Sequence, residues 1–300
     1  MSTFLTKILL ATDGSEDATL AARAAVDLSS RANSELYVIH AWHCVPSTHF
    51  EAFLRSQLEQ EARKVLDAQV ERIEESGVTV AGAYLREGTP VDGILDLAEE
   101  LEPDLLVIGS RGLGSVQRLL MGSVSEGIVH GTAFPVLAMR GGERAWPPER
   151  IVVGDDGSDE AKGAEELAAG IGELYGAKGL LVRAYPKLPE VDAEGRRSNA
   201  RIVEDELRRE QRSLTDRARE IEVAFGLRYR VGIATGDPAS SLLRAAEEGA
   251  VEKALIAVGS RGLGVVRRVR LGSVSTKVLH AARGPVLVHP RPRTEMGGIE

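Results

Sequence analysis

One stretch of the sequence gathers glycine, serine and arginine at spacings that suit an anion, and the chain carries it twice. It reads GSRGLGSVQRLLMGSVS over residues 109–125 and GSRGLGVVRRVRLGSVS over residues 259–275, with 12 of 17 positions identical. Each copy follows an aliphatic run and leads into a segment with helical spacing. Glycines let a ligand approach backbone N–H groups closely and allow positive φ. The start of a helix adds unpaired N–H donors and a partial positive charge. The pattern therefore predicts a phosphate-binding loop in each copy.

The candidate binding residues of these loops follow from their position relative to the strand, the turn and the helix start. In the first loop Gly109 closes the strand, two further glycines shape the turn, and Gly122 with Ser123 opens the helix. Ser123 and Ser125 add hydroxyl donors, although Ser123 could equally be the helix N-cap, and a capped turn without a ligand stays an alternative. The candidates are Gly109, Arg111, Gly112, Gly114, Gly122, Ser123, Val124 and Ser125, and then Gly259, Arg261, Gly262, Gly264, Gly272, Ser273, Val274 and Ser275.

An aspartate follows the first predicted strand of each half, in ATDGS as Asp13 and in GDDGS as Asp156. Ligands of open α/β sheets lie outside the carboxyl ends of the strands, where the strand order reverses. With the order 3-2-1-4-5, strands one and four flank that crevice, so the aspartate and the glycine loop share one rim. A carboxylate there could accept from an adenosine amino or hydroxyl group, or hold a Mg²⁺ that bridges to phosphates. The alternative is an Asp-Gly-Ser turn that caps the next helix.

Two familiar nucleotide motifs are missing from these loops. No Gly-Lys-Ser/Thr ends the glycine loop, as a P-loop requires, and the turn after the first strand does not read G-x-G-x-x-G. P-loop and ordinary dinucleotide-binding chemistry are therefore disfavoured.

The elements that must position these residues also occur twice, which indicates a tandem duplication. KILLATDGSEDA (7–18) aligns with RIVVGDDGSDEA (150–161), ELYVIHAW (35–42) with KGLLVRAY (178–185), and EGTPVDGILDLAEE (87–100) with TGDPASSLLRAAEE (235–248). The seam GGERAWPPE, 141–149, carries the glycines and prolines of a linker. We therefore expect one domain over residues 1–142, a linker over 143–149 and a second domain over 150–300.

Each copy alternates between predicted strands and predicted helices. Runs such as Ile8–Leu10 and Leu105–Ile108 have no polar alternate face, as is typical of parallel strands buried on both sides. Apolar residues recur at helical spacing between the strands, and Gly77 and Gly226 stand where two of these helices should stop. The helical stripes are Leu54, Leu58, Val65 and Ile73 in 50–76, and Val203, Leu207, Leu214, Ala218 and Ile221 in 200–224. The fold class is α/β, with two tandem, doubly wound, five-stranded parallel sheets.

The spacing G-x2-G-x9-G-S in both loops, with ILLATDGS and FPVLAMR as the first and last strands, resembles the ATP-binding motif of universal stress proteins. The resemblance covers essentially the whole chain. It implies an adenine nucleotide alpha hydrolase-like fold of order 3-2-1-4-5 and one ATP in each domain. It also implies adenine read by backbone at Ala41 and Ala184, Asp13 and Asp156 on the adenosine or metal side, and phosphates held by the loops.

The resemblance also carries expectations about assembly and activity. The final strands, FPVLAMR (134–140) and GPVLVHP (284–290), are expected to pair edge to edge between the domains. Two tandem chains would then be free to form a homodimer. Many members of the family bind ATP without rapid turnover and act as stress or growth regulators, so the resemblance implies such a role. We see no Gln or Glu beside the loop to position water, so we expect slow or absent hydrolysis. A slow ATPase or phospho- or adenylyl-transferase, and an interaction scaffold without nucleotide, are the alternatives.

The two halves differ in charge at equivalent positions. The first has Ala11-Thr12 before its aspartate and the second has Gly154-Asp155, an extra carboxylate that could repel phosphate or help to bind metal. The second loop carries Arg267, Arg268 and Arg270 where the first has Gln117, Arg118 and Leu120. We predict that the second site binds ATP at least as tightly as the first at low salt.

Other ligand-type residues have simpler interpretations. His40, His43, Cys44 and His49 suggest zinc, but the second copy has none of them, so a metal site is disfavoured. His130 and His280 fall near the end of the last helix of each copy, where a cation complements the helix dipole.

Composition limits the classes of partner and the compartment. The net charge of −8 argues against nucleic acid as the main partner. No apolar run has the roughly 18–20 residues that span a bilayer. The single cysteine fits a reducing compartment, so we expect a cytoplasmic protein.

Overall fold

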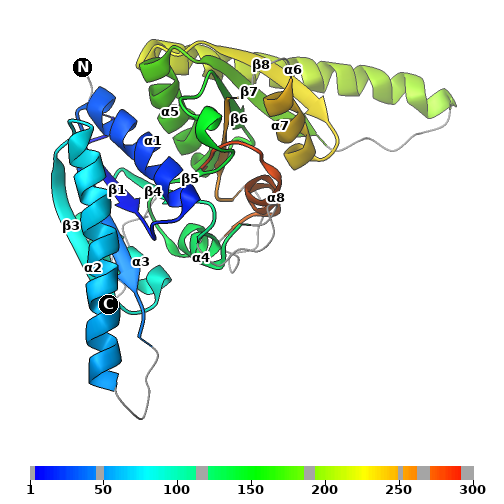
Figure 1. Cartoon of the computed structure of the whole chain (residues 1–300). Coiled ribbons are helices and arrows are strands. Elements are labelled where there is room, and N and C mark those ends of the chain that lie inside the picture. The colour runs from blue at the N-terminus through cyan, green and yellow to red at the C-terminus, as the bar shows by residue number, and fades with distance from the viewer. Residues whose placement is uncertain are drawn as a thin grey trace, which may run out of the picture.

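The computed structural model describes residues 4–44, 51–112, 121–185, 193–248, 253–261 and 271–291. Strands and helices alternate along the first half as the sequence predicts, and the second half repeats the order (Figure 1). The first half contains β1 (Lys7–Ala11), α1 (Glu16–Ala32), β2 (Glu35–Trp42), α2 (Glu51–Glu75), β3 (Val80–Glu87), α3 (Pro90–Leu101), β4 (Leu105–Gly109), α4 (Ser123–Gly131) and β5 (Val136–Met139). After the short helix η1 (Glu143–Ala145), the second half contains β6 (Arg150–Gly154), α5 (Asp159–Tyr175), β7 (Lys178–Tyr185), α6 (Ala193–Phe225), β8 (Tyr229–Thr235), α7 (Pro238–Glu247), β9 (Ala254–Gly259), α8 (Ser273–Ala281) and β10 (Val286–His289).

The strands form one sheet in the order β3-β2-β1-β4-β5-β10-β9-β6-β7-β8. Within each half the neighbouring strands are parallel and follow the order 3-2-1-4-5, so the predicted fold class is confirmed. The final strands β5 and β10 pair antiparallel, with Leu287 opposite Leu137. The edge-to-edge contact is therefore confirmed, and it joins the two expected sheets into a single continuous one.

Helices cover both faces of this sheet and give it two core layers. α1, α2, α5 and α6 pack on one face, and α3, α4, α7 and α8 pack on the other. Ile8 and Leu10 belong to the first layer and Leu9 to the second, and all three are fully buried. Because both sides of each strand are covered, the strand sequences show no polar alternation. No helix among the described residues is both long and apolar enough to cross a membrane.

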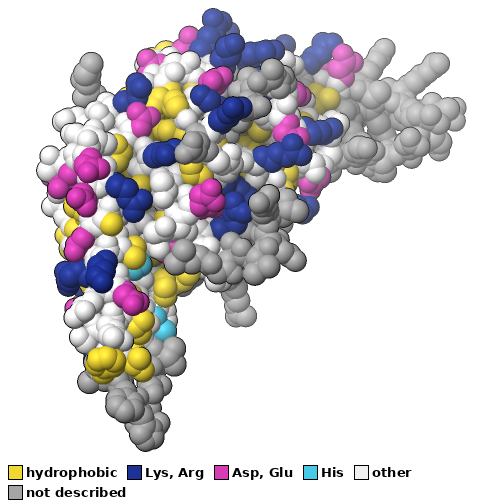
Figure 2. Space-filling view, in the orientation of Figure 1, with side chains coloured by type: hydrophobic (Ala, Val, Ile, Leu, Met, Phe, Trp, Pro, Cys, Tyr) yellow, Lys and Arg dark blue, Asp and Glu magenta, His cyan; other side chains and the backbone are white. Residues whose placement is uncertain are grey.

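The ends of the long helices fall at the predicted glycines, but one predicted apolar stripe is only partly buried. Gly77, two residues after the end of α2, has φ of +88°, and Gly226, directly after α6, has φ of +84°. In α2, Ile73 is buried whereas Leu54 and Leu58 are 42% and 37% exposed, because α2 extends beyond the strands on which it packs. Figure 2 shows hydrophobic side chains at the surface where α2 begins.

In α6 the inner part of the predicted stripe lies in the core. Leu214, Ala218 and Ile221 are buried and Leu207 is half-buried. The side chain of Val203 lies outside the described residues. The buried part of the stripe fixes α6 on the sheet next to β7 and β8.

Candidate functional site

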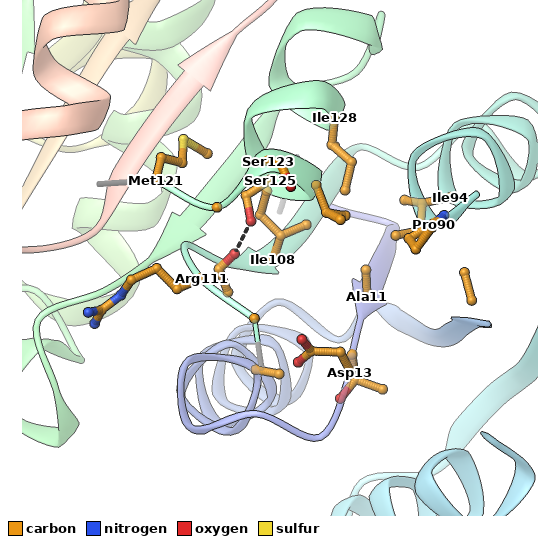
Figure 3. Close-up of a pocket in the computed structure, with 17 residues that line it drawn as sticks. Ala11, Asp13, Pro90, Ile94, Ile108, Arg111, Met121, Ser123, Ser125 and Ile128 are labelled. Atoms are coloured by element: carbon orange, nitrogen blue, oxygen red, sulfur yellow. Dashed lines mark hydrogen bonds between the residues drawn. The ribbon is translucent and has the colours of Figure 1, made fainter. Parts of the chain in front are cut away.

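Each half has a cavity at the carboxyl edge of the sheet, at the point where the strand order reverses. The first, of about 400 Å³, is lined from the ends of β1 and β4, and the second, of about 580 Å³, from the ends of β6 and β9. Open α/β sheets bind their ligands at this place. Figure 3 shows Asp13 on one side of the first cavity, with Ser123 and Ser125 at the start of α4 on the other.

The structure brings together every predicted site residue that it describes. The first cavity is lined by Asp13, Ala41, Gly109, Arg111, Gly112, Gly122, Ser123, Val124 and Ser125. The second cavity is lined by Asp156, Ala184, Gly259, Arg261, Gly272, Ser273, Val274 and Ser275. Gly114, Gly262 and Gly264 lie outside the described residues. Residues from four separate segments of each half therefore meet at one cavity.

Sequence reasoning missed the apolar wall of both cavities. In the first it includes Pro90 and Ile94 of α3, Ile108 of β4 and Met121, and in the second Pro238, Leu242, Val258 and Leu271. These residues read as ordinary core positions, and no chemical group marks them. The one available signal was the repeated Gly-x-Pro of EGTP and TGDP, which places proline in the first turn of α3 and α7.

The starts of α4 and α8, which line the two cavities, differ from the starts of α1, α3, α5 and α7. α1 and α5 have the side chains of Ser15 and Ser158 as N-caps, and α3 and α7 have those of Thr89 and Asp237. α4 and α8 instead have glycine N-caps, Gly122 and Gly272, with no side-chain hydrogen bond to the helix start. The alternative in which Ser123 caps α4 is wrong, because Ser123 is the first helical residue. The first N–H groups of α4 and α8 are thus left for another acceptor.

The described glycines of the first loop do not serve to provide positive φ, and some of them are closely packed. Neither Gly109, Gly112 nor Gly122 has a positive φ. A Cβ on Gly109 would lie 2.8 Å from the backbone nitrogen of Ala18 on α1, and one on Gly112 would lie 2.4 Å from Oδ2 of Asp13. The expected conformational role is therefore wrong for these three residues. Glycine is needed at 109 because the backbone of α1 occupies the space, whereas a side chain at 112 would require the Asp13 carboxylate to turn aside.

Two predicted donors are already engaged within the protein. Ser125 donates its hydroxyl to the carbonyl of Gly109 at 2.7 Å, and Ser275 donates to Gly259 at 2.6 Å. These bonds tie the helix start to the strand end, so the expectation of a hydroxyl proton free for a ligand is wrong. Ser123 is exposed at the first cavity.

The guanidinium of Arg111 is held away from the first cavity (Figure 3). Its Nε lies 3.1 Å from Oδ2 of Asp17, and its Nη2 lies 3.3 Å from Oδ1 of the same carboxylate. Ser110 donates to that carboxylate as well, at 2.8 Å. Arg111 therefore lines the cavity without aiming its charge into it, because a buried carboxylate on α1 attracts the guanidinium.

The aspartate after the first strand makes the expected turn and also lines the cavity of its half. Oδ1 of Asp13 accepts from the backbone N–H of Ser15 at 3.0 Å, and Ser15 in turn caps α1. Asp156 accepts from Ser158 in the same way at 3.0 Å. Both aspartates also line a cavity. The turn and the site are thus one structure, in which the turn fixes the carboxylate at the rim.

Three of the histidines set aside in the sequence, His40, His130 and His280, lie close to oxygen atoms of the protein. Nδ1 of His40 lies 2.7 Å from the carbonyl oxygen of Thr12, and His49 lies outside the described residues. His130 and His280, both in the last turn of their helices, have Nε2 at 3.9 and 3.6 Å from Oε1 of Glu126. Glu126 of α4 therefore lies close to α8 of the other half.

Comparisons with known proteins point to one family. The model of the universal stress protein family matches residues 5–140 and again residues 148–290. A universal stress protein from Thermus aquaticus is 36% identical over 133 residues, 44% of this chain and 97% of its own length. One from Mycolicibacterium smegmatis is 26% identical over 305 residues, 95% of this chain and 97% of its own length. The crystal structure of a universal stress protein from Archaeoglobus fulgidus has the same fold, with a TM-score of 0.68 at 24% identity over 97% of this chain and 100% of that one.

Proposed function

Because this chain belongs to the universal stress protein family, with two tandem copies of the family's domain, we propose that it is a regulatory protein that binds one ATP in each half. The observation that carries this proposal is the pair of glycine-capped helix starts. α4 and α8 begin at the edge of a cavity, and their N-cap glycines place no side chain on the first N–H groups. Such a helix start binds phosphate through its N–H groups and its dipole.

The rest of each cavity suits a purine nucleoside. Its volume of about 400 or 580 Å³ lies in the ordinary range for small-molecule sites. The apolar wall from α3 and β4, or from α7 and β9, offers a surface on which a flat base can pack. Ala41 and Ala184 line the cavities at the ends of β2 and β7, where backbone groups would read the adenine edge. Asp13 and Asp156 would then lie on the adenosine or metal side.

Magnesium would enter these sites with the nucleotide. The described residues include no group of three or more His, Cys, Asp or Glu side chains that could hold a metal ion. Each cavity does have a carboxylate at its rim, Asp13 or Asp156. Mg²⁺ keeps several waters and takes few protein ligands when phosphates supply the others. One rim carboxylate is therefore sufficient for a phosphate-bound Mg²⁺.

The composition of the first cavity favours binding over turnover. Among its described lining residues, the ionisable side chains are Asp13 and Arg111, and Arg111 is paired with Asp17. Phosphoryl transfer requires a group that orients the nucleophile and charge that stabilises the transferring phosphoryl group. We propose that ATP acts by shifting the population of conformations that a partner recognises. Sustained release of phosphate or AMP would instead support a slow ATPase or a phospho- or adenylyl-transferase.

The test introduces an aspartate at the N-cap of α4, and then of α8, so that its carboxylate occupies the helix start. Gly122 has φ −71° and ψ 149°, the extended geometry of an N-cap, and a Cβ there would meet no neighbour closer than 3.4 Å. In Gly122→Asp the new carboxylate should cap α4 and occupy the proposed phosphate position, while the helix gains a few tenths of a kcal/mol. Calorimetry should give two ATP per chain for the wild type, one for this variant, and none when Gly272→Asp is added.

Ser56→Asp is the control for the effect of the added negative charge. It places the same charge on the exposed side of α2 and should still bind two ATP per chain. Mass spectrometry of the small molecules released on denaturation checks occupancy independently. If the double Gly→Asp variant binds ATP as the wild type does, the site is misplaced. A wild-type chain that neither binds ATP nor melts at higher temperature with it would favour an interaction scaffold.

A further inference from the structure

The second cavity has a carboxylate at its rim that the first one lacks. Asp155 lines the second cavity at the position where the first copy has Thr12. Its side chain is 2% exposed. Oδ1 accepts from the backbone N–H of Gly157 at 2.6 Å, and Oδ2 accepts from Nη2 of Arg183 at 2.5 Å. Asp155 is thus buried, hydrogen-bonded and paired with a cation.

Arg183 connects that carboxylate to the long helix α6. It lies on β7 directly before Ala184, which lines the cavity. Its side chain is 16% exposed, and its Nη1 donates to Oε2 of Glu210 on α6. The pairing with Asp155 and Glu210 outweighs desolvation and raises the pKa of Arg183. One guanidinium therefore joins the rim of the second cavity, strand β7 and helix α6.

The first half has no equivalent of this ion pair. His40 stands at the position of Arg183, and its ring contacts the main-chain oxygen of Thr12. At the position of Glu210, α2 has the buried Ala62. At these positions the first half therefore has no carboxylate–guanidinium pair, and α2 is instead joined to the sheet by the exposed ion pair of Arg55 with Glu87 on β3.

This difference has a consequence for anions. A carboxylate buried next to a phosphate-binding helix start repels phosphate unless a cation compensates it. Removing one partner of a buried pair leaves the other uncompensated. We propose that Arg183 is a positioning residue of the second nucleotide site, which neutralises Asp155 and ties the rim to α6. The inference rests on the proposed nucleotide binding and makes the anion affinity of one site depend on an ion pair.

The test compares the two sites within one chain. Calorimetry with ATP on Arg183→Met should show the second site weakened about tenfold or more, with the first unchanged. Adding Asp155→Thr installs the neutral residue of the first site and should restore the affinity to within about threefold. A purely structural role of Arg183 predicts no such rescue, since its link to α6 stays lost. If Arg183→Met does not fold, Arg183→Lys takes its place. It keeps the charge, so its ATP affinity at the second site should remain close to that of the wild type.

A second measurement needs no ligand. Hydrogen exchange of α6 around Glu210 should become faster in Arg183→Met and stay fast after the rescue, because the link from β7 is gone in both. Arg208→Met is the matched control, since it removes an exposed pair with Glu204 on the same helix and should change neither readout.

Unchanged second-site affinity in Arg183→Met, or a loss that Asp155→Thr does not rescue, overturns the inference. If the wild-type chain binds no ATP at either site, the proposed function is wrong. In that case hydrogen exchange still tests the link between Arg183 and α6, and unchanged exchange of α6 in Arg183→Met would show that the link is wrong.

Discussion

At the scale of single residues, the glycines of one loop meet different physical requirements. Gly109 is confined by α1, since a Cβ would lie 2.8 Å from backbone atoms of Asp17 and Ala18. Gly122 is not confined, because the atoms nearest to an added Cβ would be 3.4 Å or more away. Glycine at 109 therefore allows β4 to pack on α1. Glycine at 122 leaves the start of α4 open, which a serine or aspartate would close.

This distinction predicts opposite effects of two small substitutions. Gly109→Ala should lower the free energy of unfolding by about 1–3 kcal/mol, because the methyl group overpacks against helix backbone that cannot rotate away. Gly122→Ser should not lower it, since a serine N-cap fits the same backbone geometry. Urea denaturation of both variants measures the difference. Equal stability of Gly109→Ala and the wild type would show that α1 shifts freely.

The sequence predicts which residues line the site but not which of their side chains are hydrogen-bonded within the protein. The glycine and serine positions follow from the repeat, since local spacing defines a strand, a turn and a helix start. The pairing of Arg111 with Asp17 does not follow, because the two residues are 94 positions apart and meet only when α1 packs on β4. The bond from Ser125 to Gly109 spans only 16 positions, but it forms only when the start of α4 packs against the end of β4. Tertiary packing, not local spacing, decides which donors remain for a ligand.

At the scale of elements, the second half holds its outer helix with charge where the first uses neutral residues. Glu165 of α5 is 1% exposed, and one of its oxygens lies 2.7 Å from Nε of Arg217 on α6. Its other oxygen has no hydrogen-bond partner among the described residues. Burial raises the pKa of Glu165 to about 7, against the opposing effect of Arg217. In the first half Ala22 and Gln69 occupy the equivalent positions.

The raised pKa predicts a pH-dependent stability of the α5–α6 contact. The folded state binds this proton more tightly than the unfolded state, so the stabilisation is complete below pH ~4.5 and is lost as pH rises through about 7. Between pH 5 and 8 the wild type should lose up to about 3 kcal/mol relative to Glu165→Gln. Urea denaturation at several pH values measures this, with the half-exposed Glu166→Gln as control. Parallel profiles for wild type and Glu165→Gln would contradict it.

The order of elements was predictable, whereas the exposed start of α2 was not. Strands buried on both faces and glycines at helix ends are local signals, and they gave the alternation of strands and helices. The apolar spacing of α2 continues past the sheet, because 25 helical residues span about 38 Å and the eight-residue β2 about 26 Å. Apolar spacing predicts which side of a helix faces the sheet, but it does not predict how far the sheet extends beneath the helix. Phe53, Leu54 and Leu58 are exposed for that reason.

At the scale of the whole molecule, the two halves are joined by more than a linker. Besides the β5–β10 pairing, Arg140 is 6% exposed and donates to the carbonyl of Leu279 in α8 at 2.5 Å. Trp146 of the linker donates to Asp27 on α1 at 3.0 Å and packs edge-on against Tyr175 of α5. Edge strands that would otherwise pair two molecules are therefore paired within one chain. The homodimer expected from the family resemblance stays a prediction, and it would need another surface.

The continuous sheet predicts that the two halves unfold together. Arg140→Met keeps the aliphatic stem but removes the donor that satisfies the end of α8, which should lower the free energy of unfolding by about 1–3 kcal/mol. Because β5 and β10 share one ladder, the loss should appear equally in β1 of the first half and β6 of the second. Hydrogen exchange in increasing urea measures the opening of both strands. The fluorescence of Trp146, which packs against Tyr175, reports the unfolding of the junction between the halves. Two separate transitions, with β1 unaffected by the variant, would mean that each half is its own cooperative unit.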